Sequence, residues 1–388
     1  MKKTESLTEK ELTYLIELRH RLHKTPEISG AEKCTSSIII EELEKTNPDE
    51  LHKEIGGYGI LAVYDSGEKG SCIMLRAELD ALPITEESGM SYSSTIEGQS
   101  HACGHDGHMT VILGVARYLK NNRPRAGKVL LLFQPSEETG EGAARLLNDP
   151  VFKGFQIDRS YAFHNLPGFS MNEVIIRDQT FASASVGLIC RLKGESSHAA
   201  YPEQGRSPAP IISDIISYLD EVNVPDIEST SYAIGTITYV MIGEKAFGIS
   251  PGSAEFGITF RAVSDQLLTG LKEKVIQRVD HFSKQLNIKV MKEEIEPFKA
   301  TVNNEDCVNK VVKAAEKTGL EISIPEHPFP WSEDFGRFSD ISNIALFGLG
   351  AGIENPHLHA GEYDFNDELI KPAVQLFKEI LNIEWEQD

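Results

Sequence analysis

Short apolar runs that alternate with helical stretches constrain the fold of this chain more than any other feature. Helical stretches, such as residues 109–120 and 141–147, separate several of the strand-like runs. Continuous apolar runs of this kind are typical of parallel sheets, because helices cover both faces of such sheets. We therefore predict a mostly parallel sheet with strands at 60–64, 72–77, 129–133, 161–163 and 344–347. Two further helices, at 8–24 and 31–45, are predicted before the first strand.

The middle of the chain has a different order of elements. From about residue 183 to 295, the pattern predicts strand, helix, strand, strand, helix and strand, the order of a ferredoxin-like fold. These elements are predicted at 185–192, 208–221, 231–240, 254–261, 264–286 and 288–293. A chain of 388 residues is also long enough for two domains. The expected fold class is therefore α/β, with one domain formed by 1–182 and 297–388 and a smaller α+β domain, 183–296, inserted into it.

The charge and cysteine content exclude several classes of protein. The 59 acidic and 38 basic side chains give a formal net charge of -21, so nucleic acids and anionic membranes would repel the chain. The five cysteines are far apart and odd in number, which indicates free thiols in a reducing compartment. Residues 1–11 lack the apolar core of a signal peptide, and no run of eighteen apolar residues occurs. We expect a cytoplasmic protein that binds neither nucleic acid nor membrane.

Residues 101–108 contain three imidazoles, a thiol and a carboxylate within eight positions. Two glycines interrupt the run, so the groups can converge without helical spacing. Such a set of donors is typical of a site for a divalent metal ion. Cys103 and His105 are the strongest candidates, because in an extended turn both can face one ion. The charge of the thiolate would also help to neutralise that ion.

The other polar residues of this run have more ordinary interpretations. An isolated histidine is more often structural than a ligand, so we expect His101 and His108 to support the site. Asp106 precedes an apolar helical stretch, and capping is the commonest role of aspartate there. We therefore expect Asp106 to cap a helix that starts near Gly107.

Further candidate ligands follow predicted strands elsewhere in the chain. Loops at the carboxyl ends of parallel strands lie along one edge of the sheet, so residues distant in sequence can meet there. The candidates are Asp80, Glu137, Glu138, His164 and His359. His357 competes with His359 for the same role, and composition cannot choose between them. Asp80 either orients a ligand histidine or is a turn residue.

The adjacent carboxylates Glu137 and Glu138 suit two different roles. Adjacent carboxylates are usually a solvated pair, but these follow the apolar run 129–133 and should lie at a strand end. One of them can bind metal while its neighbour takes a proton from water and returns it to a leaving group. The pair therefore indicates acid–base chemistry beside a metal.

Together these residues resemble the M20 family of metallopeptidases and amidohydrolases. The resemblance is to the subgroup that includes hippurate hydrolases, auxin-conjugate hydrolases and N-acetyl-diaminopimelate deacetylases. It runs almost from end to end of the chain. The matching segments are 21–27, 76–83, 101–108, 134–138, 197–202, 333–335 and the region around His359.

The resemblance implies an amidohydrolase that uses two divalent metal ions per chain. The implied ligands are Cys103, His105, Glu138, His164 and His359, with Cys103 placed to bridge the two ions. Glu137 would be the general base. The implied substrate is an N-acyl amino acid, which would be cleaved to a carboxylic acid and a free amino acid. Cysteine and histidine suit zinc, but manganese, cobalt and nickel remain open, because availability often decides the metal.

The resemblance also assigns roles within the inserted domain. In this family the insertion is a lid that also forms the dimer, so a homodimer or a higher homo-oligomer is expected. His198 occupies the position of a lid histidine that contacts the substrate, often across the dimer. Arg261 lies where lid arginines often hold a substrate carboxylate. Asp80 is expected to assist catalysis by orienting a ligand.

The chain departs from the family pattern at three places. Glu78 replaces the usual aspartate, and its longer side chain alters the geometry next to the metal ligands. Ser196 and Ser197 replace two glycines before His198, which stiffens that loop. The segment 247–251 lacks the asparagine often found before the Ile-Pro of the lid, so any substrate contact of that residue is in doubt.

Three other functions are consistent with parts of the pattern. A dipeptidase or exopeptidase could use the same two-metal site. A cysteine hydrolase with Cys103 as nucleophile would need no metal and would therefore stay active with a chelator, but it leaves Glu138, His164 and His359 unexplained. A degenerate relative could bind a metabolite without turnover, although the ligand set is intact. Metal analysis and a panel of N-acyl amino acids separate these functions.

Overall fold

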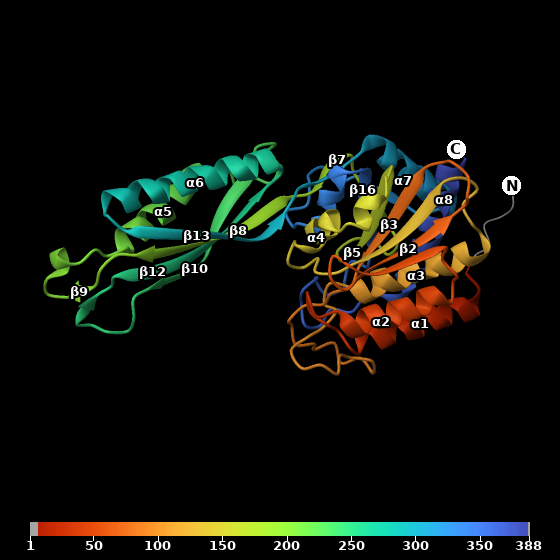
Figure 1. The fold of residues 1–388 in the computed structure, drawn as a ribbon, viewed down its shortest axis with the longest axis horizontal. Helices are drawn as coiled ribbons and strands as arrows, with labels where there is room; N and C mark the ends of the chain where they lie inside the picture. The colour runs from red at the N-terminus through yellow and green to blue at the C-terminus, as the bar shows by residue number, and fades with distance from the viewer. Residues whose placement is uncertain (1–6, 387–388) are drawn as a thin grey trace. The chain divides into compact units, whose positions relative to one another are not determined.

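The computed structural model describes residues 7–386, which pack into two compact units (Figure 1). The larger unit comprises the described part of Met1–Phe181, with Thr301–Pro325 and the described part of Asp334–Asp388. The smaller unit comprises Ala182–Ala300 and Glu326–Glu333. The domain boundaries predicted after residues 182 and 296 stay predictions. Residues 1–6 of the stretch expected to lack a signal peptide lie outside the described residues.

The larger unit contains an eight-stranded sheet with the order β1-β2-β4-β3-β5-β16-β6-β15. Its central strands β4, β3, β5 and β16 are parallel, which confirms the prediction of a mostly parallel sheet. At the edges, β1 and β2 run antiparallel to their neighbours. The strands are β1 (Glu50–Ile55), β2 (Gly59–Asp65), β3 (Cys72–Glu78), β4 (Lys128–Gln134), β5 (Arg159–Leu166), β6 (Val174–Ile175), β15 (Ile322–Ser323) and β16 (Asn343–Gly350). A separate two-stranded sheet pairs β7 (Gln179–Ala182) with β14 (Thr301–Asn303).

Helices pack against this sheet and form the main hydrophobic core with it. All residues of β4 from Val129 to Gln134 are buried, as expected for a strand that is covered on both faces. The helices are α1 (Glu9–His23), α2 (Lys33–Glu44), α3 (His105–Asn121), α4 (Gly142–Asn148), α7 (Glu305–Thr318) and α8 (Ile370–Trp385), with short 3-10 turns at Phe152–Gly154, Asp334–Asp340 and Asp367–Leu369. None of the helices within residues 7–386 is long and apolar enough to cross a lipid bilayer.

The smaller unit has the ferredoxin-like order predicted for the middle of the chain. Its antiparallel sheet has the order β10-β12-β8-β13, and α5 and α6 lie on one face of it (Figure 1). The elements are β8 (Ala184–Lys193), α5 (Ala209–Val222), β10 (Ala233–Ile242), β12 (Ser253–Ala262), α6 (Asp265–Gln285) and β13 (Lys289–Phe298). A second, two-stranded antiparallel sheet pairs β9 (Ser197–His198) with β11 (Ile249–Ser250), and a 3-10 turn follows at Pro202–Gln204.

The carboxyl ends of the central strands bring the candidate ligands of the larger unit to one edge. Asp80 follows β3 by two residues, and the pair of glutamates follows β4. His164 lies near the end of β5, where it is paired with Gly348 of the parallel strand β16. This is the position at which open parallel sheets bind their ligands.

Candidate metal centre

A left-handed glycine starts α3 and separates its two strongest candidate ligands. Gly104 is the N-cap with φ 93°, Cys103 precedes it, and His105 is the first helical residue. A Cβ on Gly104 would also lie 2.6 Å from the side-chain oxygen of Asn165, so only glycine fits here. Because the helix begins two residues before Gly107, the prediction that Asp106 caps it was wrong: Asp106 lies inside the first turn.

The Asp106 carboxylate instead forms a buried ion cluster beneath the site. Arg19 donates to it at 3.1 Å, and Nδ1 of His23 lies 2.8 Å from it. Arg19 also donates to Asp364 at 2.7 Å. Although burial alone would raise the pKa of the Asp106 carboxyl, His23 and Arg19 lower it well below its usual range. Burial alone would lower the pKa of His23, but Asp106 and Glu86 raise it to about 10. The cluster therefore carries charge and anchors α1 to the start of α3.

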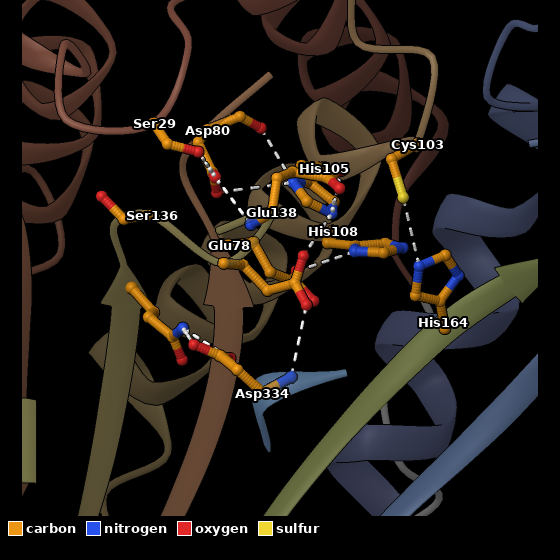
Figure 2. Close-up of polar contacts among 12 residues, drawn as sticks. Ser29, Glu78, Asp80, Cys103, His105, His108, Ser136, Glu138, His164 and Asp334 are labelled. Atoms are coloured by element: carbon orange, nitrogen blue, oxygen red, sulfur yellow. Dashed lines mark hydrogen bonds and ion pairs between the residues drawn. The ribbon is translucent and has the colours of Figure 1, made fainter. Parts of the chain in front are cut away.

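Cys103, His105 and His164 form the first group of metal donors. One ligand atom from each residue lies within 4.8 Å of the other two, and all three side chains are buried. Sγ of Cys103 is 3.4 Å from Nε2 of His164, and the two side chains point toward each other in Figure 2. Nδ1 of His164 lies 2.9 Å from the carbonyl oxygen of Asn165, which leaves Nε2 directed at the group.

A second group shares Cys103 with the first and adds Glu138 and His359. Oε2 of Glu138 is 3.9 Å from Nε2 of His359. The backbone of His359 has φ 64°, an uncommon value for a residue other than glycine, and its N–H donates to the carbonyl of Ala102 at 2.9 Å. Among the described residues, this candidate group contains His359 and not His357, and the role of His359 as a ligand stays a prediction.

The two adjacent carboxylates both lie near the same ring nitrogen of His105. Nε2 of His105 is 3.7 Å from Oε1 of Glu138 and 4.0 Å from Oε2 of Glu137. The side chain of Glu137 is buried, and its Oε1 accepts the backbone N–H of Asp334 at 3.3 Å. Glu137 thus lies beside the candidate metal donors, and its Oε1 is hydrogen-bonded to the backbone of Asp334.

Asp80 holds two parts of the site together. Its backbone carbonyl oxygen lies 2.8 Å from Nδ1 of His105, whereas its carboxylate is 3.7 Å from the same nitrogen. Oδ2 of the carboxylate accepts the backbone N–H of Glu138 at 3.0 Å and the hydroxyl of Ser29 at 2.6 Å (Figure 2). The histidine is therefore oriented by the Asp80 backbone, and the Asp80 side chain fixes the loop of Glu138.

The longer side chain of Glu78 reaches the histidine at the far end of the run. Glu78 accepts from Nδ1 of His108 at 2.8 Å and pairs with Arg76, and all three side chains are buried. Nε2 of His108 faces the side-chain oxygen of Asn165 at 2.5 Å. His101 is fully buried as well, and burial lowers its pKa to about 3. His108 is therefore held on both ring nitrogens by protein side chains.

This donor set fits divalent metal ions. A thiol, three imidazoles and a carboxylate, the ligand types that zinc prefers, form two groups that share one sulfur. They come from the start of α3, the loop after β4, strand β5 and the loop of His359. The Cys103 thiol and the carboxylates of Glu137 and Glu138 lie close to these imidazoles and also require positive charge to balance them. The geometry of the described residues is therefore compatible with two ions close together.

The two candidates in the smaller unit have partners within that unit. His198 is exposed in the two-stranded sheet of β9 and β11, and its Nδ1 accepts the backbone N–H of Ala200 at 3.0 Å. Arg261 donates to the carbonyl of Pro330 and to the hydroxyl of Ser332, both at 3.2 Å. Burial lowers the pKa of Arg261. Their roles toward a substrate stay predictions.

Comparison with known proteins identifies the family. A family model described as Peptidase family M20/M25/M40 matches residues 74–383. The chain belongs to this family. This confirms the predicted M20 resemblance and, with it, the assignment as a metal-dependent amidohydrolase.

Relatives of known name in the M20 family match nearly the whole chain. A hippurate hydrolase of Campylobacter jejuni is 29% identical, over 94% of this chain and 94% of its own length. An N-acetyl-L-cysteine deacetylase of Bacillus subtilis is 30% identical, over 86% of this chain and 80% of its own length. The solved structure of the Bacillus subtilis YxeP protein, described as a dinuclear metal binding peptidase from the M20 family, superposes with a TM-score of 0.81 at 24% identity. It covers 97% of this chain and 99% of that one, and shows that the fold is shared.

The loop that carries both glutamates of this M20 chain has no room for a side chain at Gly142. The Gly142 N–H donates to the carbonyl of Ser136 at 3.0 Å, and a Cβ at residue 142 would lie 1.8 Å from the carbonyl oxygen of Pro135. We expect Gly142→Ala to lower the free energy of unfolding by about 1–3 kcal/mol, because the buried loop must shift. Thermal unfolding monitored by circular dichroism measures this loss.

The matched control for this prediction is Gly154→Ala. A Cβ at residue 154 meets no atom within 4 Å, and Gly154 lies in the same unit. An equal drop in melting temperature for the two variants would contradict the prediction.

Several residues that build the site were not identified from the sequence. They are Arg19, His23, Ser29, Glu32, Ser136, Asn165 and Asp334. Some of them fall inside segments that match the M20 family, such as 21–27 and 134–138, and this was the only available signal. They act through hydrogen bonds to backbone or to other side chains, which no spacing rule reveals.

Proposed function

We propose that this chain hydrolyses the amide bond of N-acyl amino acids and releases a carboxylic acid and a free amino acid. The observation that carries the proposal is the buried carboxylate of Glu137 beside two donor groups that share Cys103. The names of the relatives support it, since a hippurate hydrolase and two kinds of N-acetyl amino acid deacetylase are among them. Their substrates all contain an acyl group on an amino acid nitrogen.

The residues that would hold the metals follow from the two donor groups. We assign Cys103, His105, Glu138, His164 and His359 as the residues that would hold two divalent ions, and Cys103 belongs to both donor groups. When bound, such ions polarise a substrate carbonyl and make water a better nucleophile at neutral pH. Zinc is the first choice for a site with thiol and imidazole ligands, and manganese, cobalt and nickel are alternatives.

Glu137 is the residue we assign to proton transfer. It takes a proton from the attacking water as the new C–O bond forms at the acyl carbon. When the C–N bond breaks, it delivers this proton to the nitrogen of the leaving amino acid, so that one carboxylate serves both steps. The N–H of Asp334 on Oε1 holds the carboxylate in place and leaves Oε2 on the side of His105.

A substrate panel tests the proposal. The purified protein should be assayed with acetyl, benzoyl and indole-acetyl amino acids in the presence of zinc, manganese, cobalt or nickel. Hydrolysis of at least one member, measured as free amino acid, is the expected result. Faster cleavage of unblocked dipeptides would instead make the chain a peptidase, and binding without turnover would make it a metabolite-binding protein.

From the family resemblance we also propose that His198 contacts the substrate and that Arg261 binds its carboxylate. His198→Ala is expected to lower turnover by about a hundredfold, the effect of losing one donor to a developing oxyanion. The metal content of the variant should stay at the wild-type value, because His198 is not among the proposed ligands. Turnover with a good panel substrate and metal analysis of the same preparation measure the two quantities.

Mixing the His198→Ala variant with an inactive Glu137→Gln variant tests whether the histidine acts across a homodimer. Partial recovery of activity supports action across the dimer, and no recovery supports action within one chain. Wild-type activity in His198→Ala alone would contradict the assignment. We further propose that the enzyme acts in the cytoplasm, since all five cysteines lie within the described residues and none of them forms a disulfide.

A further inference from the structure

A buried carboxylate in the loop between α1 and α2 contacts the loop that carries the two glutamates. Glu32 is fully buried, and its Oε1 accepts the backbone N–H of Ser136 at 2.8 Å and the Ser136 hydroxyl at 3.3 Å. The same oxygen accepts the N–H of Gly30 at 2.9 Å. Ser136 immediately precedes Glu137, so this contact joins the N-terminal loop to the site.

Ser136 has a backbone conformation that needs outside support. Its φ is 54°, in the left-handed region that a side chain with a Cβ disfavours, and the residue is buried. Such conformations persist where the surroundings hold them. Here Glu32 binds the N–H of Ser136, and the N–H of Gly142 binds its carbonyl oxygen. These two hydrogen bonds fix the backbone conformation of Ser136 and so the orientation of Glu137, the next residue.

The backbone N–H of Glu138, on the other side of Glu137, is also supported by the loop between α1 and α2. Ser29 donates to Oδ2 of Asp80, and this oxygen accepts the N–H of Glu138, as Figure 2 shows. The segment from Ser29 to Glu32 therefore supports the backbone on both sides of Glu137. Glu32 binds the N–H of Ser136 directly, and Ser29 binds the Asp80 carboxylate that accepts the N–H of Glu138.

We propose that Glu32 is a positioning residue that holds Ser136 in the left-handed conformation and thereby aims the carboxylates of Glu137 and Glu138. Its effect on turnover and on metal binding rests on the proposed function, whereas its effect on the conformation of Ser136 does not.

The contact requires an acceptor oxygen rather than a negative charge. All three donors bind Oε1 of Glu32, while Oε2 is buried with no hydrogen-bond partner among the described residues. Burial is the largest cause that raises the pKa of this carboxyl, which favours a neutral form. A glutamine at this position keeps the acceptor, and a leucine of similar size removes it.

Two variants of Glu32 separate positioning from general packing. Glu32→Leu is expected to lower kcat roughly tenfold, because the left-handed form of Ser136 is no longer held against its intrinsic cost. KM should change by less than about twofold, because Glu137 contributes to proton transfer in the transition state and not to binding of the substrate in the ground state. Glu32→Gln should restore kcat to within about twofold of wild type, because it supplies the same acceptor.

A second substitution at Ser136 provides the sharper test. Glycine adopts φ near 54° without strain, so Ser136→Gly should recover most of the kcat that Glu32→Leu loses.

Glu27→Gln is the matched control, because the Glu27 carboxylate lies in the same loop but accepts the N–H groups of Cys34 and Thr35 at the start of α2. Loss of stability in this control, without loss of kcat, is the expected result.

Two measurements need no turnover. Calorimetric titration of the metal-free variants with zinc should show weaker binding in Glu32→Leu and recovery in the double variant, because Glu138 lies on the same loop. A crystal structure of Glu32→Leu should show Ser136 outside the left-handed region. A left-handed Ser136 in that structure, or a double variant no better than Glu32→Leu, overturns the proposal. If no N-acyl amino acid is cleaved by wild type, the proposed function fails, while the Ser136 conformation still tests the role of Glu32.

Discussion

Replacing Glu137 with glutamine is expected to lower kcat by about a thousandfold, within the range that a single general acid–base contributes. Glutamine has nearly the same shape and can still accept the N–H of Asp334 on its carbonyl oxygen, so the loop should keep its conformation. The amide cannot take a proton from water at neutral pH, and proton transfer to the leaving amine is therefore lost. Steady-state kinetics with the best panel substrate measures the effect.

The metal content of this variant distinguishes a base from a ligand. Because Glu137 is not in the proposed ligand set, elemental analysis of Glu137→Gln should give the wild-type amount of metal. Glu141→Gln is the control from the same loop, since Glu141 is exposed and pairs with Arg145. Full activity in Glu137→Gln would refute the assignment, and a variant without metal would show that Glu137 is a ligand.

Removal of metal by a chelator is expected to abolish turnover. Without cations the thiol and carboxylates of the donor groups lose the positive charge that balances them, and the substrate carbonyl loses its activation. Activity should return when zinc, manganese, cobalt or nickel is added back, to an extent that ranks these metals. Assays after dialysis against chelator, with circular dichroism to verify the fold, measure the loss and the recovery.

The same experiment discriminates against chemistry at a cysteine nucleophile. If Cys103 attacked the substrate directly, the chelated protein would keep its activity and a thiol-alkylating reagent would remove it. Cys34 is the exposed thiol, so these assays should be carried out in a Cys34→Ala background. Activity that survives chelation but not alkylation would replace the two-metal proposal with a cysteine hydrolase.

The central part of the fold could be predicted because each buried strand is a continuous apolar run. The strands β3 and β4 were predicted to within one or two residues for this reason. By contrast, β6 and β15 are two residues long, too short for any periodicity. The start of α3 was misplaced because Gly104 caps that helix with a left-handed backbone rather than with a side chain.

The site was predictable to the extent that its groups belong to recognisable motifs. Candidate ligands could be selected because thiols, imidazoles and carboxylates follow strands that end at one edge. That His359 rather than His357 lies among the candidate donors depends on the fold of its loop, where the backbone N–H of His359 donates to the carbonyl of Ala102. Glu32 could not be predicted at all, because its partner Ser136 is 104 residues away and is bound through a backbone N–H.

The contacts of Arg19 have a consequence for synthesis of the protein. This side chain joins Asp106 to Asp364, which is 345 residues further along the chain than Arg19 itself. During translation Arg19 leaves the ribosome well before its partner Asp364, because 345 positions separate the two residues. Contacts over such separations form late and slowly. The nascent chain therefore cannot complete the buried ion cluster beneath His105 until Asp364 has emerged, so the first turn of α3 receives its full support only late in folding.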